Sequence, residues 1–303
     1  MKEYLKFSVT MCVYGGDNPD YFDLALSSII CQTVQPNEIV LAADGPIPET
    51  ITAIIEKYQR QLTGSAISFK VIYLGKNVGL GRARQICLEH CSCELVALMD
   101  ADDLSSPERF ELQLCRFAAH PEVSVIGGNI REFIDTPENC VGRRVVPETD
   151  EGIRNYMKKR CPMNHVTVMF RKKDVTDAGG YLHWHYNEDY YLWIRLALAG
   201  YRFGNVNEEL VNVRIGKEMY RRRGGIKYFK SEAKLQTFML KNKLINPFRY
   251  VVNVAERFIL QVLMPNWLRG FLFRKLARKP SHISPSAKAP AETQISIKLR
   301  MRV

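Results

Sequence analysis

The chain has 303 residues, 46% of them hydrophobic and 25% charged, so it can bury a substantial core and fits one catalytic domain plus an appendage. The first nine residues carry two lysines and a glutamate and form no apolar run long enough for a signal peptide, so we expect no export. The formal net charge of +11 calls for an anionic partner: a nucleic acid, a nucleotide diphosphate or an acidic membrane surface.

Short apolar runs, each followed by a turn and an amphipathic segment, make up roughly the first 120 residues. The apolar runs predict strands at Phe7–Val13, Glu38–Ala43, Phe69–Leu74 and Leu95–Met99. The amphipathic segments predict helices at Tyr21–Gln32, Glu49–Gln61, Gly79–Cys91 and Pro107–Ala119. This alternation predicts an α/β fold with a parallel sheet, in which ligands bind beyond the carboxyl ends of the strands.

The alternation of strands and helices fades after about residue 120. Here we expect strands at Val123–Ile130 and Val166–Phe170, and helices at Glu151–Lys159 and Glu188–Ala199. From Gly225 onward the pattern is helical, with predicted helices at Ile226–Lys243, Pro247–Leu263 and Trp267–Lys279. The tail over residues 280–303 has little apolar content, and we expect it to be flexible.

The eight cysteines lie between Cys12 and Cys161, mostly within apolar stretches. This placement favours reduced core thiols in a cytosolic protein. Cys87, Cys91 and Cys93 cluster with a histidine, but they lack a second ligand pair at the usual spacing, so we predict no zinc site there.

Three carboxylates follow the predicted strand Leu95–Met99, in the string Asp100-Ala101-Asp102-Asp103. Side chains two residues apart in an extended segment point the same way, so Asp100 and Asp102 can converge on one cation while Asp103 faces elsewhere or caps the next helix. Clustered carboxylates repel one another unless a cation compensates them. Oxygen ligands of this kind suit Mg²⁺ or Mn²⁺ bridging a substrate diphosphate, and a polar loop with a helix cap is the plain alternative.

Two other strand ends carry residues that suit a nucleotide. Asp44, after the second predicted strand, can accept hydrogen bonds from ribose hydroxyls or a base edge, or can simply form the turn before Gly45. The loop from Lys76 to Arg84 enters a helix with glycines and cationic side chains, and its amides can hold anionic groups. Both features support a diphosphate site beside the carboxylates.

As a set, these motifs resemble the family 2 glycosyltransferases, which have the so-called GT-A fold. The resemblance runs from about residue 6 to 215 and rests on segments in the correct order, namely Ser8–Tyr14, Leu26–Thr33, Asn77–Arg84, Met99–Asp103 and Asn187–Asp189. Within this family, the chain most resembles bacterial transferases that build capsular, exopolysaccharide or O-antigen units, including the amylovoran biosynthesis type. The chain lacks the Gln-x-x-Arg-Trp signature and the multiple membrane spans of processive synthases, which favours one sugar per encounter.

The resemblance implies a catalytic domain over residues 1–220, with a nucleotide-sugar half at about 1–120 and an acceptor half at about 121–220. It makes Asp189 the base of a single displacement with inversion, with Glu188 orienting the site or serving as a backup. The positive end of the helix should keep Asp189 ionised. Asp102, with Asp100, would bind the Mn²⁺ or Mg²⁺ ion. The donor-binding residues would be Tyr14, Asp44, Asn77, Arg84, Asp100 and Arg222.

The expected donor is a UDP-sugar carrying a hexose or an N-acetylhexosamine, and the expected acceptor is a saccharide, linked to a lipid diphosphate. His165 precedes a strand and can line the acceptor site, although a lone histidine can equally be structural. Trp184 lies in an aromatic loop that can stack on a sugar ring or can simply pack in the core. The sequence leaves the sugar, the linkage and the oligomeric state open.

Residues 221–279 are basic and amphipathic. The run around Arg222 can fold over the donor diphosphate or face acidic lipids, or it can be a solvated charge run. Pro265 and the surrounding charges exclude a membrane-spanning helix, and an amphipathic helix pair in the membrane interface fits better. The same helices can instead pack on the catalytic domain. We expect a cytoplasmic protein, peripheral to the inner face of the cell membrane.

Three other functions are alternatives to glycosyl transfer. A nucleotide-dependent oxidoreductase is disfavoured because Tyr14-Gly15-Gly16-Asp17 is not the Gly-x-Gly-x-x-Gly phosphate loop. A nucleic-acid-binding module is disfavoured because the basic residues lie beside an apolar helix pair rather than a stacking platform, so we expect no nucleic-acid partner. A catalytically inactive membrane scaffold for polysaccharide assembly is the remaining rival.

Overall fold

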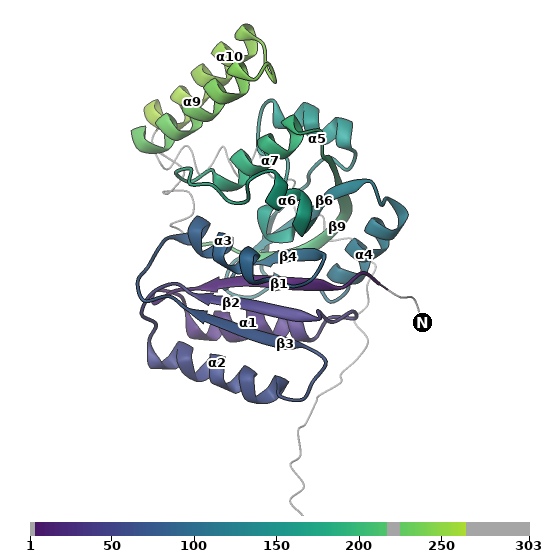
Figure 1. The fold of residues 1–303 in the computed structure, drawn as a ribbon. Helices are drawn as coiled ribbons and strands as arrows, with labels where there is room; N and C mark the ends of the chain where they lie inside the picture. Colours follow the sequence, from purple (N-terminus) through teal and green to yellow (C-terminus); the bar gives the residue numbers. More distant parts are fainter. Residues whose placement is uncertain (1–3, 217–224, 265–303) are drawn as a thin grey trace, which may run out of the picture.

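The computed structural model describes residues 4–216 and 225–264, which form a central sheet covered by helices on both faces (Figure 1). Its first half is parallel, with the strand order β3-β2-β1-β4. The strands are β1 (Phe7–Val13), β2 (Glu38–Ala43), β3 (Ser68–Tyr73) and β4 (Leu95–Met99). The helices that connect them are α1 (Pro19–Ile30), α2 (Glu49–Leu62) and α3 (Leu80–His90).

The second half of the sheet is mixed. Beyond β4 the strand order continues β8-β6-β9-β5, with β7 paired to β6. These strands are β5 (Leu104–Ser105), β6 (Val123–Phe133), β7 (Cys140–Arg144), β8 (Met169–Arg171) and β9 (Arg202–Arg214). The helices between them are α4 (Arg109–Ala119), α5 (Asp150–Met157), α6 (Lys172–Asp177) and α7 (Glu188–Leu198), with a 3₁₀ turn η1 (His165–Thr167). β8 runs antiparallel to β4 and β6, and β6 runs parallel to β9.

The hydrophobic core has one layer on each face of the sheet. Alternate residues of a strand point to opposite faces, so Val9 and Met11 pack with α1, α2 and α4, whereas Val40 and Val96 pack with α3 and α7. The central strands are buried on both faces, which explains why β2 and β4 are nearly continuous apolar runs and why only the small polar residues Ser8 and Thr10 interrupt β1. The expected α/β fold and the bounds of these strands are confirmed.

Several parts of the second half differ from the sequence prediction, which gave no strand at β5 or β7 and no helix at α6. The strand predicted at Val166–Phe170 is wrong at its start, because the Thr167 hydroxyl donates to the Asn164 carbonyl oxygen, 2.7 Å away, and closes a 3₁₀ turn before β8 begins at Met169. The long strand β9 was not predicted, since its polar sequence carries no apolar run. β9 is paired to β6 along most of its length.

The described C-terminal helices are α9 (Ile226–Lys241) and α10 (Pro247–Phe258), which continues into a π-helical turn, η2 (Ile259–Leu263). They lie side by side above α7 and α5 (Figure 1). Leu235 and Met239 of α9 belong to the same core layer as α7, so α9 packs on the catalytic fold. No helix in residues 4–216 and 225–264 is long and apolar enough to cross a bilayer. The helix predicted at Trp267–Lys279 and the tail over 280–303 lie outside the described residues.

Candidate active site

The loop after β3 is fastened to the end of β2 by Asp44. Its buried carboxylate accepts hydrogen bonds from the backbone N–H of Val78, at 2.7 Å, and of Gly79, at 3.1 Å. The Asn77 side chain donates to the Asp44 carbonyl oxygen at 3.3 Å. Gly45 has a φ of +89°, and a Cβ there would lie 2.7 Å from the Asn77 nitrogen, so the turn requires glycine. Asp44 therefore positions the loop that carries Asn77, and its direct contact with a nucleoside stays a prediction.

Asp100 and Asp102 lie close together at the end of β4, but not for the expected reason. β4 ends at Met99 and Ala101–Asp102 form a turn, so the turn rather than strand alternation brings the two carboxylates together. Partial desolvation and the charges of Asp100 and Asp17 raise the pKa of Asp102 to about 6. Asp17 accepts a hydrogen bond from the Tyr14 N–H at 2.9 Å, which adds a third carboxylate to this edge. Such crowding of negative charge favours a cation.

Asp103 has a different role. It is buried and accepts a hydrogen bond from the Arg214 N–H at 2.8 Å, so it anchors the end of β9 instead of facing Asp100 and Asp102. Burial and the neighbouring charges of Asp102 and Asp100 raise its pKa well above the usual range. The N-cap of α4 is Glu108, so Asp103 does not cap that helix.

Arg84 joins the end of β4 to the start of α7. One guanidinium nitrogen, Nη2, lies 2.9 Å from Asp100 Oδ1, and the other, Nη1, lies 3.4 Å from Glu188 Oε1. Burial opposes the positive charge of Arg84, but Asp100, Tyr181 and Glu188 outweigh it and raise the arginine pKa. The side chain is only 11% exposed, so the ion pairs are shielded from water and geometrically fixed.

Asp189 begins α7 beside Glu188 and is partly buried. Its Oδ1 accepts a hydrogen bond from the Tyr190 N–H at 2.7 Å. Burial, followed by repulsion from Glu188, raises its pKa to about 6, although the Tyr190 N–H, Arg84 and Arg144 act in the opposite direction. Desolvation therefore outweighs the favourable position of Asp189 at the helix start. At neutral pH the carboxylate is still mostly ionised.

His165 lies beside the same arginine. Its Nε2 is 3.1 Å from the Tyr181 hydroxyl, and its ring centroid is 6.1 Å from that of Trp193. Burial, with a contribution from the Arg84 charge, lowers its pKa well below the usual value, so this histidine is neutral. A neutral ring can exchange hydrogen bonds with a sugar hydroxyl but cannot supply a charge.

Trp184 and Tyr14 occupy different environments. Trp184 packs on Tyr191, with ring centroids 4.4 Å apart, and its Nε1–H donates to the Ser231 carbonyl oxygen of α9 at 3.3 Å. Tyr14 is 45% exposed at the carboxyl end of β1, with its ring over Gly16. Arg222 lies outside the described residues.

Two arginines were missed by sequence reasoning. Arg144 of β7 donates to Asn164 Oδ1 at 2.8 Å and to the Cys161 carbonyl oxygen, so it holds the loop beside Asp189. Arg214 stacks over the Tyr21 ring at 3.7 Å and donates to the Asp102 carbonyl oxygen at 3.3 Å. These contacts join segments far apart in the chain, and a single sequence carries no signal for them.

The family model for Glycosyl transferase family 2 matches residues 8–178, which is more than half of the chain. The chain belongs to glycosyl transferase family 2. A second model, Glycosyl transferase family group 2, matches residues 95–278 of this family 2 glycosyltransferase. Membership sets aside the alternative of an oxidoreductase, because the family transfers glycosyl groups.

Relatives support the same assignment. The glycosyltransferase is 35% identical over 269 residues to the amylovoran biosynthesis glycosyltransferase AmsE of Erwinia amylovora, covering 89% of this chain and 98% of that one. It is 33% identical over 274 residues to the Escherichia coli UDP-Gal:alpha-D-GlcNAc-diphosphoundecaprenol beta-1,3-galactosyltransferase, covering 90% and 97%. In fold it is similar to S. aureus TarS 1-349 in complex with UDP-GlcNAc, with a TM-score of 0.62, 18% identity, and coverage of 84% and 73%. The GT-A fold is thereby confirmed.

Proposed function

We propose that this glycosyltransferase moves a hexose or N-acetylhexosamine from a UDP-sugar to a hydroxyl of a lipid-diphosphate-linked saccharide, in surface polysaccharide synthesis. The Escherichia coli relative is named for a UDP-galactose donor and a diphosphoundecaprenol-linked acceptor, which supports both substrate classes. The observation that carries the proposal is the double contact of Arg84, which fixes Asp100 and Glu188 in one site. In this proposal the donor binds on the Asp100 side of the Arg84 guanidinium, and the acceptor binds on its Glu188 side.

Asp100 and Asp102 fit a Mg²⁺ or Mn²⁺ ion. The raised pKa of Asp102 reflects desolvation first and then repulsion from Asp100 and Asp17, which a cation would relieve, and carboxylate oxygens are the ligands these ions prefer. Within the described part of the chain no cluster of three or more His, Cys, Asp or Glu side chains is poised to hold a metal. A pair of carboxylates leaves coordination positions for substrate phosphates, as Mg²⁺ usually requires. When bound, the ion would stabilise the charge of the departing diphosphate.

Asp189 accepts the proton of the attacking hydroxyl in this proposal. The acceptor oxygen forms a bond to the anomeric carbon as the bond from that carbon to the diphosphate oxygen breaks, and UDP leaves with the electron pair. A single displacement of this kind inverts the anomeric configuration. Tyr14, Asn77 and the loop shaped by Asp44 hold the nucleoside side, whereas His165 borders the acceptor side.

We also propose that α10 rests on a membrane surface. Its inward side chains are polar, because Asn253 and Arg257 are buried, while an apolar stripe faces outward. The stripe consists of Phe248, Val251, Val252, Phe258, Ile259 and Leu263, each at least 39% exposed. A helix with an outward apolar face suits the interface of a bilayer, where a lipid-linked acceptor is presented. Peripheral attachment would bring the enzyme to that acceptor.

The test is release of UDP from a panel of UDP-sugars, with and without Mn²⁺, in the presence of a lipid-diphosphate-linked saccharide. We expect metal-dependent release with one donor, loss of donor binding in Asp102→Asn, and full release in Glu56→Gln, which removes an exposed charge on α2. No release from any donor with wild-type protein would favour the inactive scaffold instead. Equal activity of Asp102→Asn and wild type would remove the metal assignment.

A further inference from the structure

A hollow of about 400 Å³ opens between the loop that precedes α7 and the helix α9. Its lining comes from the loop before α7 and from one side of α9, and it consists of His183, Trp184, His185, Lys227, Lys230, Ser231 and Lys234. We call these seven residues the basic hollow. The predicted donor-binding residues Tyr14, Asp44, Asn77, Arg84 and Asp100 are absent from the lining. The basic hollow is therefore a separate feature from the donor side of the site.

The basic hollow carries positive charge that the described protein does not neutralise. Lys227, Lys230 and Lys234 follow one another at helical spacing on the same side of α9, and all are exposed. None of the ion pairs between described residues includes any of these lysines. Glu232, the single acidic residue of α9, is turned toward Arg257 instead. Lysine clusters without acidic partners attract anionic ligands such as phosphates.

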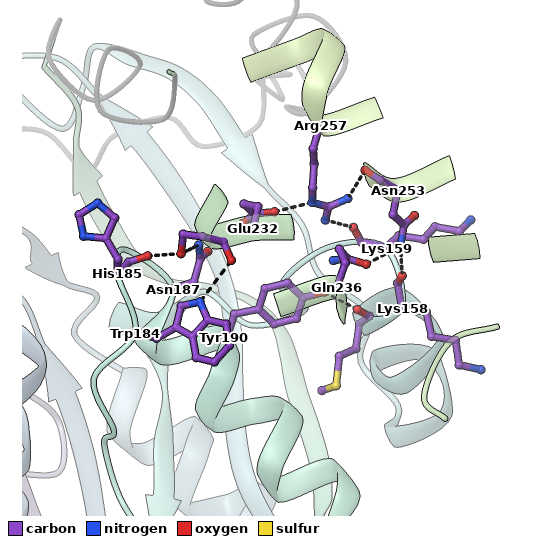
Figure 2. Close-up of polar contacts among 12 residues, drawn as sticks. Lys158, Lys159, Trp184, His185, Asn187, Tyr190, Glu232, Gln236, Asn253 and Arg257 are labelled. Carbon is purple, nitrogen blue, oxygen red and sulfur yellow. Dashed lines mark hydrogen bonds and ion pairs between the residues drawn. The ribbon is translucent and has the colours of Figure 1, made fainter. Parts of the chain in front are cut away.

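The wall of the basic hollow is held in a fixed position relative to the base. Figure 2 shows that Trp184, His185 and Asn187 are fastened to α9 through hydrogen bonds with Ser231. The Asn187 amide donates to the Ser231 hydroxyl at 3.3 Å, and Asn187 is the N-cap residue of α7, which carries Asp189. The same short loop thus forms the wall of the basic hollow and leads directly into the base.

One lining residue, Trp184, already has packing partners for its ring. The Trp184 ring lies against Tyr191, and Lys234 Nζ is 4.7 Å from the centroid of the Trp184 ring. We therefore assign Trp184 the role of a packing residue that supports Lys234, in place of stacking on the acceptor sugar. Lys227 and Lys230 are exposed to solvent.

We propose that the basic hollow binds the diphosphate of the lipid-linked acceptor, and this inference rests on the proposed function. In an acceptor whose sugar is joined directly to a diphosphate, one sugar ring separates the attacked hydroxyl from the phosphate charges. The anion site must then lie next to the base, as the basic hollow does through Asn187. Lys227, Lys230 and Lys234 supply the charge, and the outward apolar stripe of α10 lies on the neighbouring helix, toward which the lipid chain can run.

Lys227→Gln with Lys230→Gln tests the proposal, because both side chains are exposed and their loss should leave the fold intact. The matched control is Lys241→Gln with Lys243→Gln, which removes the same charge from the last residue of α9 and from the turn that follows it. Each is assayed with two soluble acceptors of identical sugar and alkyl chain, one joined through a diphosphate and one a plain alkyl glycoside.

We expect the Lys227/Lys230 variant to raise KM for the diphosphate acceptor by roughly tenfold or more, because charge-assisted contacts are lost. The KM for the UDP-sugar, the KM for the alkyl glycoside and the control variant should stay within about twofold of wild type. Lys227→Arg with Lys230→Arg should restore the low KM. An unchanged KM for the diphosphate acceptor, or an equal rise for both acceptors, would overturn the proposal.

A binding measurement separates this inference from the proposed function. A short alkyl diphosphate without a sugar is titrated into each protein in the absence of metal and nucleotide, so no transfer is needed. Wild type should bind it at least about tenfold more tightly than the Lys227/Lys230 variant. If wild type binds this probe but transfers no sugar from any UDP-sugar, the proposed function fails and the anion site stands. If the variant loses only its affinity for phosphatidylglycerol vesicles, the occupant is a lipid headgroup and the proposal is wrong.

Discussion

The Arg84 guanidinium lies 2.9 Å from the Asp100 carboxylate with only 11% of the arginine side chain exposed. The same guanidinium reaches Glu188, 104 residues further along the chain, at 3.4 Å. Arg84 therefore fixes the distance between the β4 edge and the start of α7. Since Asp189 adjoins Glu188, the position of the proposed base depends on this arginine.

Arg84→Lys tests that dependence. Lysine keeps the charge but has no planar fork to bridge Asp100 and Glu188 together. We expect kcat to fall roughly 30-fold or more, which corresponds to about 2 kcal/mol, the value of one charged hydrogen bond. Steady-state kinetics with the UDP-sugar measure this. Arg82→Lys, on the same helix with an exposed ion pair to Glu89 at 3.7 Å, should stay within about twofold. An equal loss in both variants would contradict the positioning role.

The pKa of Asp189 predicts an acidic limb in the pH profile, that is, a fall in kcat/KM at low pH. A base must be deprotonated, so kcat/KM should fall as the pH drops through about 6. Asp189→Asn should lower kcat by roughly 10³-fold, spare UDP binding and abolish this limb.

Because the pKa of the Asp189 carboxyl is raised in the fold, its stabilising contribution is present at low pH and is lost as the pH rises through about 6. Asp189→Asn should therefore melt at the same or a higher temperature at pH 7, and a lower temperature would indicate a structural role.

The parallel half of the fold was predictable because burial on both faces forces each strand to be a short apolar run. β1, β2 and β4 have the predicted bounds for this reason. β9 was missed because residues such as Asn205 and Asn207 interrupt its apolar pattern, and its place is fixed by pairing with β6. Propensity alone cannot show such long-range pairing.

The residue types of the candidate site could be predicted from the sequence, but the contacts between those residues could not. The string around Asp100 and Asp102 follows from its position at a strand end, whereas the Arg84–Glu188 contact and the Asp103–Arg214 contact depend on packing of distant segments. The sequence also did not show which face of α10 packs on the protein, because an amphipathic pattern is compatible with either face. Here the polar face, with Asn253 and Arg257, is inward.

Glu232 and Arg257 test whether α9 and α10 are part of the catalytic unit. Their side chains are ion-paired and each is 10% exposed, and Arg257 also donates to the Lys159 carbonyl oxygen at 2.7 Å (Figure 2). Arg257→Met leaves an unpaired buried carboxylate, so unfolding in urea should show a loss of about 3 kcal/mol. Glu232→Met combined with Arg257→Met removes both charges and should recover part of that loss. A double variant less stable than Arg257→Met would contradict the ion-pair account.

Phe248 and Val251 test the contact of α10 with a membrane, because they are 77% and 62% exposed and contribute little to folding. Phe248→Ser with Val251→Ser should reduce partitioning onto vesicles by roughly tenfold or more, since each buried apolar side chain contributes about 1.5–3 kcal/mol. Thermal stability should be unchanged. The matched control is Leu24→Ser, which removes a side chain 50% exposed on α1, on the opposite side of the sheet from α3 and α9 (Figure 1). Because α1 is not expected to touch lipid, equal losses in both variants would mean that partitioning follows general surface hydrophobicity, and the outward stripe of α10 would have no special role.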